Sequence, residues 1–487
     1  MDGGLKAEIE PAAATESPRL DRKTMFLYAT GSISNGIKLR GMSGFLMLFY
    51  NQVVGLPAAW VGAALMVALI LDGIIDPAVG LMSDNTPTRW GRRHPYMYAS
   101  ALPYALAFYL IWNPPLGWSN ELLLVYMAAT VISVRVFDSL FEVPVSALIP
   151  ELTSDYHQRT ELVSYRYLMG ILGGMLMSLY AYKVIFKKDA DNPEGLLGVA
   201  GYHTYGLISA IAIFVAIMIA ALGTHHRIKW LHRAPKRKFN LREVFGEVLG
   251  TLSTRELWVL TAAGIFAAVA SGVAEGLSMY FNVYFWELDP SQLAILVMAG
   301  LSAALVAIPA APFLCRRVGK RATAGFGLSL AFIVALTPVA LRLMGVMPPN
   351  GSKALLYILI VEVFIHAALV LIANIAVTSM FTDLTEASQV RTGRRSEGLL
   401  VSADNFLKKV SNGAGLFVSG AIITLVAFPA KAKPGAVDQE TLNALALVYI
   451  PTLVVLYVLS VASLSFYKLT QQAHEQNLET IRQRGAA

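Results

Sequence analysis

Apolar segments about as long as a lipid bilayer is thick recur along the whole chain, and they constrain its fold more than any other feature. A helix needs about 20 apolar residues to cross a hydrocarbon core about 30 Å thick. Because unpaired backbone amides are costly in lipid, such segments fold as helices. The sequence therefore predicts an all-α polytopic membrane protein with twelve transmembrane helices. The segments lie at 25–53, 58–83, 95–113, 121–149, 161–186, 203–223, 257–286, 290–313, 323–345, 354–381, 398–428 and 443–467.

The charges outside these segments predict the orientation of the chain. Lys and Arg concentrate in every second loop, and loops of this kind face the cytoplasm. The protein is therefore expected in the inner (plasma) membrane with both termini on the cytoplasmic side. Residues 1–23 and 470–487 form the cytoplasmic tails. The first tail is predicted to be disordered, and it lacks the apolar core of a cleavable signal peptide. The net charge of +7 thus reflects topology, and no nucleic-acid partner is predicted.

A polar interval at 224–256 divides the twelve segments into two sets of six. The stretch "PELTSDYHQRT" at 150–160 aligns without gaps on "TDLTEASQVRT" at 382–392, an offset of 232 residues. Parallel repeats of this kind are related by an axis along the membrane normal and place a binding site at their interface near mid-membrane. We therefore predict two pseudo-symmetric six-helix bundles, at 24–223 and 257–469, joined by a cytoplasmic linker at 224–256.

Two carboxylates, Asp72 and Asp76, interrupt the second apolar segment. They lie one helical turn apart on nearly the same face, so they would share a cavity. A carboxylate inside a bilayer costs about 3 kcal/mol on insertion scales, so its presence calls for an explanation. Their oxygens suit Na⁺, and two neighbouring carboxylates equally suit a proton. The alternative is that they only pair with basic residues and hold helices together, with Lys38 and Arg40 as candidates.

The fourth and fifth segments carry further charges. Arg135 can pair with Asp138 three residues later on the same helix, which leaves Glu142 without a local partner. Arg166 can grip substrate hydroxyls or a carboxylate, or it can form an ion pair between helices.

Other side chains in the segments support weaker hypotheses. Glu362 and His366 are one turn apart and can satisfy each other. Cys315 is the only cysteine, so a disulfide within the chain is excluded. Aromatic side chains can stack on the apolar faces of sugars. The candidates for that role are Tyr50, Tyr165, Tyr280, Tyr284 and Trp286.

Three longer stretches resemble one family of transporters. "LDGIIDPAVGLMSDNTPTRWGRRHP" at 71–95 is similar to the second helix and following loop of the glycoside-pentoside-hexuronide:cation symporters, the major facilitator family that includes melibiose permease. "EVPVSALIPELTSDYHQRTELVSYR" at 142–166 resembles the region between helices four and five of that family. "TDLTEASQVRTGRRSEGLLVSADNFLKKVSNGAG" at 382–415 resembles its segment after helix ten. The resemblance implies a major facilitator fold and symport of a sugar with a cation.

The resemblance also implies roles for individual residues. Two aspartates that bind the cation, a hydroxyl that assists them and a lysine beside them correspond to Asp72, Asp76, Ser139 and Lys409. The expected substrate-binding residues are an acidic residue of helix four, an arginine of helix five and its aromatic neighbour, here Glu142, Arg166 and Tyr165. Two positions depart from the family pattern. Ile75 stands where the sodium-using melibiose carriers have a polar residue, which favours H⁺ coupling or none. Gly36 stands near an acidic sugar-binding position of helix one, which argues against melibiose as the substrate.

The loop after the second segment is expected, from the same resemblance, to act as a conformational latch. Arginines there can pair with a carboxylate and with helix C-termini in one state and release them in another. The alternative is that these charges only set topology. The predicted gating residues are Asp84, Arg92, Arg93, Arg394 and Arg395.

Together these features predict a secondary transporter that moves a sugar, glycoside or hexuronate with Na⁺ or H⁺ by alternating access. The partners expected are this small molecule and membrane lipid, with no other cofactor, and the protein is predicted to be a monomer. The alternatives are a transporter of lysolipids or other amphiphiles, an uncoupled sugar uniporter, and a receptor or structural protein. An integral-membrane enzyme is disfavoured because the chain lacks HExxH, GxSxG and P-loop motifs.

Overall fold

Every secondary-structure element in the described part of the chain is helical. The computed structural model describes residues 19–86, 88–153, 155–188, 192, 194–230, 255–392 and 397–467, and it describes their side chains except at 156, 255–256, 382–392 and 397–402. Several predicted features lie outside the described residues. They are the gating residues Arg394 and Arg395, the tails at 1–18 and 468–487, and residues 231–254 of the predicted linker.

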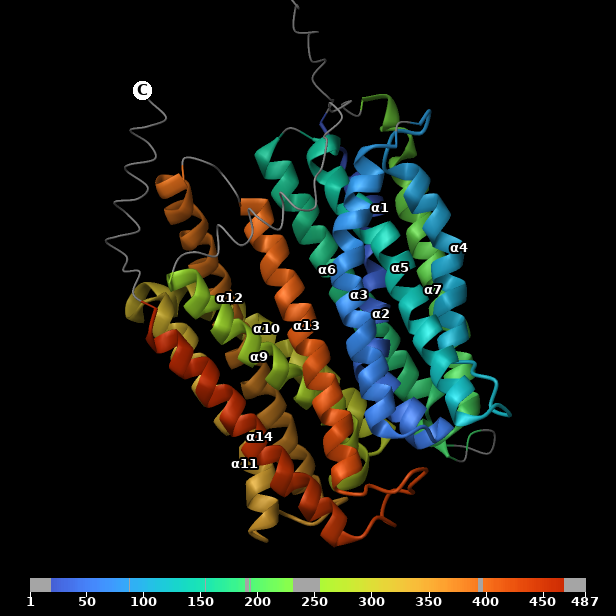
Figure 1. Ribbon diagram of the computed structural model, residues 1–487, viewed down its shortest axis with the longest axis vertical. Helices are drawn as coiled ribbons and strands as arrows, with labels where there is room; N and C mark the ends of the chain where they lie inside the picture. The colour runs from blue at the N-terminus through green and yellow to red at the C-terminus, as the bar shows by residue number, and fades with distance from the viewer. Residues whose placement is uncertain are drawn as a thin grey trace, which may run out of the picture.

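The first group of helices runs from α1 to η4 and is coloured blue to green in Figure 1. Its elements are α1 (Arg22–Thr30), α2 (Ser32–Leu48), the π-helix η1 (Phe49–Val54), α3 (Ala58–Asp84), α4 (His94–Ile111), α5 (Asn120–Leu152), α6 (Tyr156–Tyr180), the π-helix η2 (Ala181–Ile185), η3 (Gly195–Leu197), α7 (Val199–His225) and η4 (Ile228–Trp230).

The second group follows the undescribed interval and is coloured yellow-green to red in Figure 1. Its elements are α9 (Arg255–Tyr280), the π-helix η5 (Phe281–Phe285), α10 (Pro290–Val318), α11 (Lys320–Leu343), α12 (Lys353–Thr392), α13 (Glu397–Leu425) and α14 (Gln439–Ser465).

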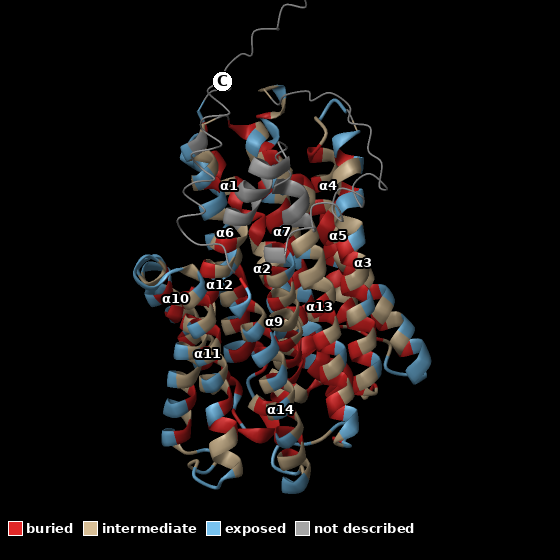
Figure 2. Cartoon of the chain, turned by 60° about the vertical axis from the view of Figure 1, so that its left-hand side comes forward, coloured by how far each residue is buried: buried red, intermediate tan, exposed pale blue. Residues whose placement is uncertain are grey.

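Nine helices among the described residues are long and apolar enough to cross a membrane. Three further helical segments occupy the positions of the remaining predicted spans: α1 with α2 and η1, then α4, then α13. The described helices are thus consistent with the twelve predicted spans. Large apolar side chains on the outer surface fit a lipid environment, since exposed apolar patches of this extent are rare in soluble proteins. Figure 2 shows exposed positions along the outer sides of the helices. Examples among the large apolar side chains are Leu305, Phe326 and Tyr357, which are 80%, 75% and 64% exposed.

The helices pack as two groups that meet along a few elements. In the first group α2 packs on α6, α3 on α5, and α4 on α5 and α7; in the second, α12 packs on α10 and α11, and α9 on α13 and α14. Between the groups, α3 packs against α13, α2 against α9, and α6 with η2 against α10. We call the groups the first half (α1 to η4) and the second half (α9 to α14).

The α2–α6 crossing depends on glycine. A Cβ built on Gly36 would lie 1.9 Å from the backbone oxygen of Gly170, and one built on Gly174 would lie 2.7 Å from that of Gly36. Small residues let helix backbones approach closely in membranes. No larger side chain fits at position 36, which accounts for the missing acidic residue that the family resemblance places near this point.

The two π-helices η1 and η5 repeat one local structure in the two halves. They begin at Phe49 and Phe281, and 281 − 49 gives the 232-residue offset of the sequence repeat. Each is followed by a residue of positive φ, Gly55 at 103° and Glu287 at 52°. The amide of the next residue then bonds back to a carbonyl of the π-helix, at 2.8 and 2.9 Å. The internal repeat is therefore present in the backbone as well as in the sequence.

The repeated loop itself is built differently in the two halves. In the first half α5 ends at Leu152, and Asp155 caps α6. Asp155 Oδ1 accepts hydrogen bonds from the backbone amides of His157 at 2.8 Å and Gln158 at 3.2 Å. Hydrogen bonds from the amides of Gln158 and His157 lower the pKa of the Asp155 carboxyl. In the second half α12 continues through the equivalent residues to Thr392.

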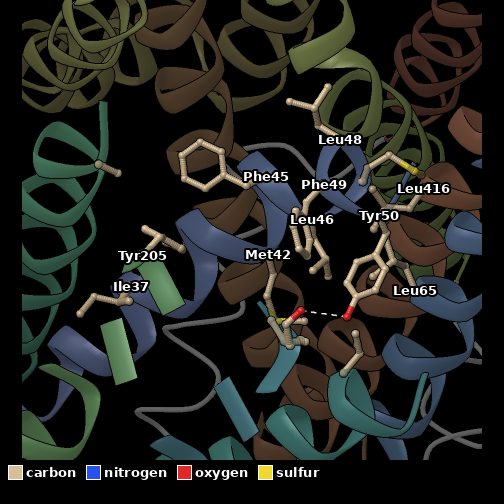
Figure 3. Packing of buried hydrophobic residues seen from close by; sticks show 14 of the residues in the cluster. Ile37, Met42, Phe45, Leu46, Leu48, Phe49, Tyr50, Leu65, Tyr205 and Leu416 are labelled. Carbon is tan, nitrogen blue, oxygen red and sulfur yellow. Dashed lines mark hydrogen bonds between the residues drawn. The ribbon is translucent and has the colours of Figure 1, made fainter. Parts of the chain in front are cut away.

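An aromatic cluster fills the core of the first half where α2 meets η1. Figure 3 shows Phe45, Phe49 and Tyr50 packed among aliphatic side chains of the same segment. Tyr50 is fully buried, and its hydroxyl donates to the backbone oxygen of Ile111 at 2.8 Å. Tyr50 is therefore a packing residue in this conformation, and its ring has no exposed face on which a sugar could stack.

Candidate functional site

The aspartates of α3 share one hydroxyl group. Ser139 Oγ of α5 donates to Asp76 Oδ1 at 2.6 Å and lies 3.3 Å from Asp72 Oδ1. The Asp72 side chain is 4% exposed, whereas that of Asp76 is 35% exposed. The structure thus brings together the three residues of α3 and α5 that the sequence nominated for cation binding, with Asp76 as the more accessible carboxylate.

A lysine from the other half joins the same two carboxylates. Lys409 Nζ of α13 donates to Asp76 Oδ2 at 2.5 Å and lies 2.8 Å from Asp72 Oδ2. Arg135 Nη1 of α5 lies 3.5 Å from the same Asp72 oxygen. We call Asp72, Asp76, Ser139, Arg135 and Lys409 the aspartate cluster. Among the described side chains, Lys409 forms the ion pairs that cross between the halves.

The prediction that Lys38 or Arg40 pairs with Asp72 and Asp76 is wrong. Lys38 Nζ binds Asp138 Oδ2 at 2.5 Å, with both side chains under a tenth exposed. Tyr104 donates to the other Asp138 oxygen at 2.9 Å. Arg135 consequently reaches Asp72 on the neighbouring helix, and the predicted pairing of Arg135 with Asp138 does not form. Arg40 has no hydrogen-bond or ion-pair partner within the described ranges.

The acidic and basic residues nominated for the substrate form a second pair. Arg166 Nη2 of α6 donates to Glu142 Oε1 of α5. The same guanidinium donates to Ser32 Oγ at 3.2 Å and to Ser146 Oγ at 2.9 Å. Glu142 Oε2 is buried and has no hydrogen-bond partner among the described residues. Tyr165 is half-buried against the core beside Arg166.

The latch residues form a compact network at the end of the first half where α3 meets α5. Arg93 Nη2 lies 2.5 Å from Asp84 Oδ1, and its Nη1 donates to Ser83 Oγ at 2.6 Å. Arg92 and Arg93 both donate to Glu151 Oε1, at 2.8 and 3.1 Å. Sequence reasoning missed Glu151, although it belongs to the quoted repeat segment.

Removing the charge of Glu151 is expected to destabilise the first half. Glu151 is 7% exposed, and breaking a buried ion pair from one side typically costs about 3 kcal/mol or more. We expect Glu151→Gln to lower the melting temperature of the purified protein, measured by intrinsic fluorescence, with Glu194→Gln in an exposed loop as the control. Equal melting temperatures for the two variants would contradict the structural role of Glu151.

A buried polar network joins the halves at the η1 end of the molecule. Gln52 Oε1 accepts from the amide of Ala432 at 3.0 Å and from Tyr284 at 3.2 Å, and its Nε2 donates to the Pro429 oxygen at 3.1 Å. Tyr280 donates to Asn51 Oδ1 at 2.6 Å. We call this network the polar seam.

Three aromatic residues that were candidates for stacking on a sugar lie in or next to the polar seam. Tyr280 and Tyr284 are fully buried, and Trp286 is 4% exposed. The hydroxyls of Tyr280 and Tyr284 donate across the halves, to Asn51 and Gln52. The suggestion that these rings stack on a sugar is wrong in this conformation.

The ionisable residues of the second half are more dispersed. Asp404 and Lys408 pair along α13 at 2.6 Å, and Asn412 donates to Glu275 at 3.4 Å. Glu362 and His366 form no hydrogen bond or ion pair with each other or with any other residue in the part of the chain that the structure describes. No group of three His, Cys, Asp or Glu side chains that could hold a metal ion occurs among the described residues.

Comparisons with known proteins agree with this architecture. Residues 27–471 match the family described as MFS/sugar transport protein. The chain is 27% identical over 464 residues to the isoprimeverose transporter of Lactiplantibacillus pentosus, covering 94% of this chain and 91% of that protein. It is 24% identical over 459 residues to the putative glycoside/cation symporter YagG of Escherichia coli K12, covering 93% of each. The solved structure of tetrameric PepTSo2 matches 91% of this chain and 97% of that chain, with a TM-score of 0.62 at 13% identity.

The helical halves define a multi-pass membrane protein of the major facilitator fold, and the family match makes it a transporter. The chain belongs to the MFS/sugar transport family, and within it to the glycoside-pentoside-hexuronide:cation symporters. The family resemblance and the all-α fold are thereby confirmed, and the family match agrees with the predicted membrane transport of a sugar.

Proposed function

We propose that the protein is a symporter that moves a sugar or glycoside together with Na⁺ or H⁺ by alternating access. The observation that carries this proposal is the aspartate cluster, in which Asp72 and Asp76 share a hydroxyl and a lysine ammonium deep between the halves. Intramembrane carboxylates of this kind mark ion pathways. The similarity to an isoprimeverose transporter and to a putative glycoside/cation symporter supports the same assignment.

Electrostatics couples the ion to the movement of the halves. Asp76 belongs to the first half and Lys409 to the second, and their contact at 2.5 Å depends on the negative charge of Asp76. A proton or Na⁺ that neutralises Asp76 weakens this contact. The halves then favour a different arrangement, and reopening delivers ion and sugar to the same side.

The sugar binds beside Glu142 and Arg166. The unpartnered Glu142 Oε2 can accept a sugar hydroxyl, and the Arg166 guanidinium is already oriented by three oxygen acceptors. A site that is oriented before binding loses less conformational entropy when the ligand arrives.

With both termini cytoplasmic, the η1 end of the molecule faces outward. The polar seam closes this outer end in this conformation. The contacts of Gln52 with the second half must break when the outer end opens. Losing the three hydrogen bonds that Gln52 forms with the second half weakens closure by about 3 kcal/mol, or roughly 150-fold in the opening equilibrium. Gln52→Leu is therefore expected to favour opening at this end.

Cysteine labelling can measure that opening. In a Cys315→Ser background, Leu48→Cys places a thiol at a fully buried position near the seam. We expect a membrane-impermeant maleimide to label it at least tenfold faster when Gln52→Leu is added. The control Gln439→Leu removes an exposed glutamine at the start of α14, and similar labelling with both leucine variants would contradict the role of the seam.

Uptake into proteoliposomes tests the proposed function. Labelled glycosides, pentoses and hexuronates are offered under a Na⁺ gradient, a proton gradient or no gradient. Accumulation under one gradient supports symport and identifies the ion. The absence of movement of every sugar contradicts the proposal.

A second candidate function is an uncoupled sugar uniporter. The observation that favours it is the position of Lys409, whose ammonium already occupies the space between the two aspartates. In that case the tethered ammonium replaces the mobile ion permanently. Equilibration of sugar at the same rate with and without either gradient would support the uniporter.

A further inference from the structure

Two ionisable side chains, Glu362 and His366, lie on the inward-facing stripe of α12, in the second half. Buried apolar residues mark this stripe, with Leu355 and Leu359 before the pair and Ala373 after it; they are 1%, 4% and 0% exposed. All five positions are separated by three, four or seven residues, the spacing of one helix face that packs on a core. The pair therefore points into the second half, and both side chains are half-buried there.

Both side chains lie deep in the membrane-spanning part of α12. This span runs from Lys353 to Phe381. With a rise of about 1.5 Å per residue, Glu362 and His366 lie about 14 and 20 Å from its first residue, in a hydrocarbon core about 30 Å thick. An unpaired charge at this depth is costly, and intramembrane carboxylates and histidines mark ion and proton pathways.

The helices that pack on α12 bring no charged partner to the pair among the residues that the structure describes. Helix α12 packs on α10, α11 and α9. The charged residues of α10 and α11 lie at or next to the helix ends. They are Arg316, Arg317, Lys320, Arg321 and Arg342. In α9, Arg255 and Glu256 lie at the start of the helix, and Glu275 accepts a hydrogen bond from Asn412.

Two tyrosines of α14 provide the polar surroundings of the pair. The Glu362 carboxylate acts electrostatically on the hydroxyl of Tyr449, and so does Tyr457. The Tyr449 ring packs on Phe281 at 4.6 Å, and the Tyr457 ring stacks on Phe332 of α11 at 5.5 Å. These ring contacts hold both tyrosines inside the second half. Glu362 thus faces neutral phenol groups rather than a base.

From this arrangement we propose that Glu362 and His366 form a second ion site, separate from the aspartate cluster, which binds a proton. A hard cation needs several oxygen ligands, whereas this pair supplies a single carboxylate. One proton is enough to neutralise that carboxylate. A proton on His366 would create opposite charges one helical turn apart, which attract each other. Because the structure shows no such ion pair, the proton lies on the Glu362 carboxyl group in this conformation.

The site gives the second half a charge switch of its own. Release of the proton leaves a carboxylate inside the second half, where an unpaired charge is disfavoured. Protonation therefore favours the conformation described here, and release favours one in which Glu362 reaches water. The pH dependence of transport that follows rests on the proposed function, whereas binding of the proton does not.

Infrared spectroscopy tests for the proton without any sugar. Exposed carboxyl groups are ionised at neutral pH, so the C=O stretching band of a protonated carboxyl reports a buried one. In the purified protein in lipid bilayers, Glu362→Gln is expected to remove the intensity of one such group per molecule. His366→Gln should leave the band unchanged, as should the control Glu440→Gln in the exposed first turn of α14. A band that Glu362→Gln leaves intact would overturn the proton site.

The pH dependence of sugar exchange tests the part of this proton in transport. The protonated fraction of a carboxyl falls about tenfold per pH unit once the group titrates, so we expect wild-type exchange to slow by about tenfold between neutral and alkaline pH. Glu362→Gln stays neutral at every pH and is expected to slow by less than about twofold. Glu362→Asp still titrates and should follow the wild-type protein.

Two results of the exchange assay would count against the proposals, and they are distinguishable. Equal slowing of Glu362→Gln and the wild-type protein would remove this proton from the transport cycle. Absence of exchange of every sugar by the wild-type protein would overturn the proposed function, while the infrared band still decides the proton site. Size-exclusion profiles establish that each variant is folded, and glutamine has the shape of the protonated carboxyl that it replaces.

Discussion

Asp76→Asn is expected to abolish gradient-driven accumulation of sugar while exchange of sugar down its own gradient survives. Asparagine keeps the shape of the side chain and can still accept the Ser139 hydrogen bond, but it carries no charge for an ion to neutralise. The internal sugar concentration should therefore rise only to about the external one, because the conformational change no longer depends on an ion. The halves still carry sugar, since Glu142 and Arg166 are unchanged.

Two uptake assays on the same proteoliposomes separate these outcomes. One measures accumulation under an imposed ion gradient, and the other measures exchange of labelled for unlabelled sugar with no gradient. Asp404→Asn is a matched control, because Asp404 is also a partly buried carboxylate paired with a lysine, 2.6 Å away on α13. Full accumulation by Asp76→Asn would remove Asp76 from the coupling mechanism.

Glu142→Gln is expected to abolish both accumulation and exchange. The substitution leaves the Arg166 guanidinium without its carboxylate and removes the free oxygen Oε2 that accepts a sugar hydroxyl. Truncating one partner of a buried charged hydrogen bond costs about 2–5 kcal/mol, so apparent affinity should fall by roughly 100-fold. This pattern differs from that of Asp76→Asn, which spares exchange.

Binding and transport should be measured together for this variant. Direct binding of the labelled sugar to purified protein reports affinity without any coupling step. Glu121→Gln is a control on the same helix, since Glu121 is exposed in the first turn of α5. If Glu142→Gln bound and exchanged sugar like Glu121→Gln, the sugar site would have to lie elsewhere.

The fold was largely predictable from the sequence, because bilayer thickness fixes the length of each apolar segment. The element α10 begins at Pro290 and α3 begins at Ala58, as the segments at 290–313 and 58–83 predict. Helix ends in the aqueous loops were less predictable. Helix α12 continues to Thr392, beyond the apolar segment that ends at 381, because polar residues can continue a helix outside the membrane.

The residues of the candidate site were predictable, but their partners were not. Spacing along one helix favoured Arg135 with Asp138, whereas contacts between helices pair Asp138 with Lys38, 100 residues away. Lys409 lies 333 residues from Asp76, and only the packing of α13 on α3 brings them together. Nothing in the sequence indicated that Gln52 joins the two halves, because a glutamine near the end of an apolar segment is typical of a helix boundary.

The packing of α3 on α13 places the aspartate cluster far from the point where the two helices first meet. The contact begins where the Ala59 amide meets the Thr424 hydroxyl at 3.3 Å, and it extends to the Asp76–Lys409 pair. The 17 residues from Ala59 to Asp76 span about 26 Å of helix, so tilting one half by about 5° about the Ala59 end separates Asp76 from Lys409 by about 2 Å. A rocking motion too small to disturb the closed end is thus large enough to break the ion pair, and a single elementary charge at Asp76 can hold or release the tilt of a whole six-helix half.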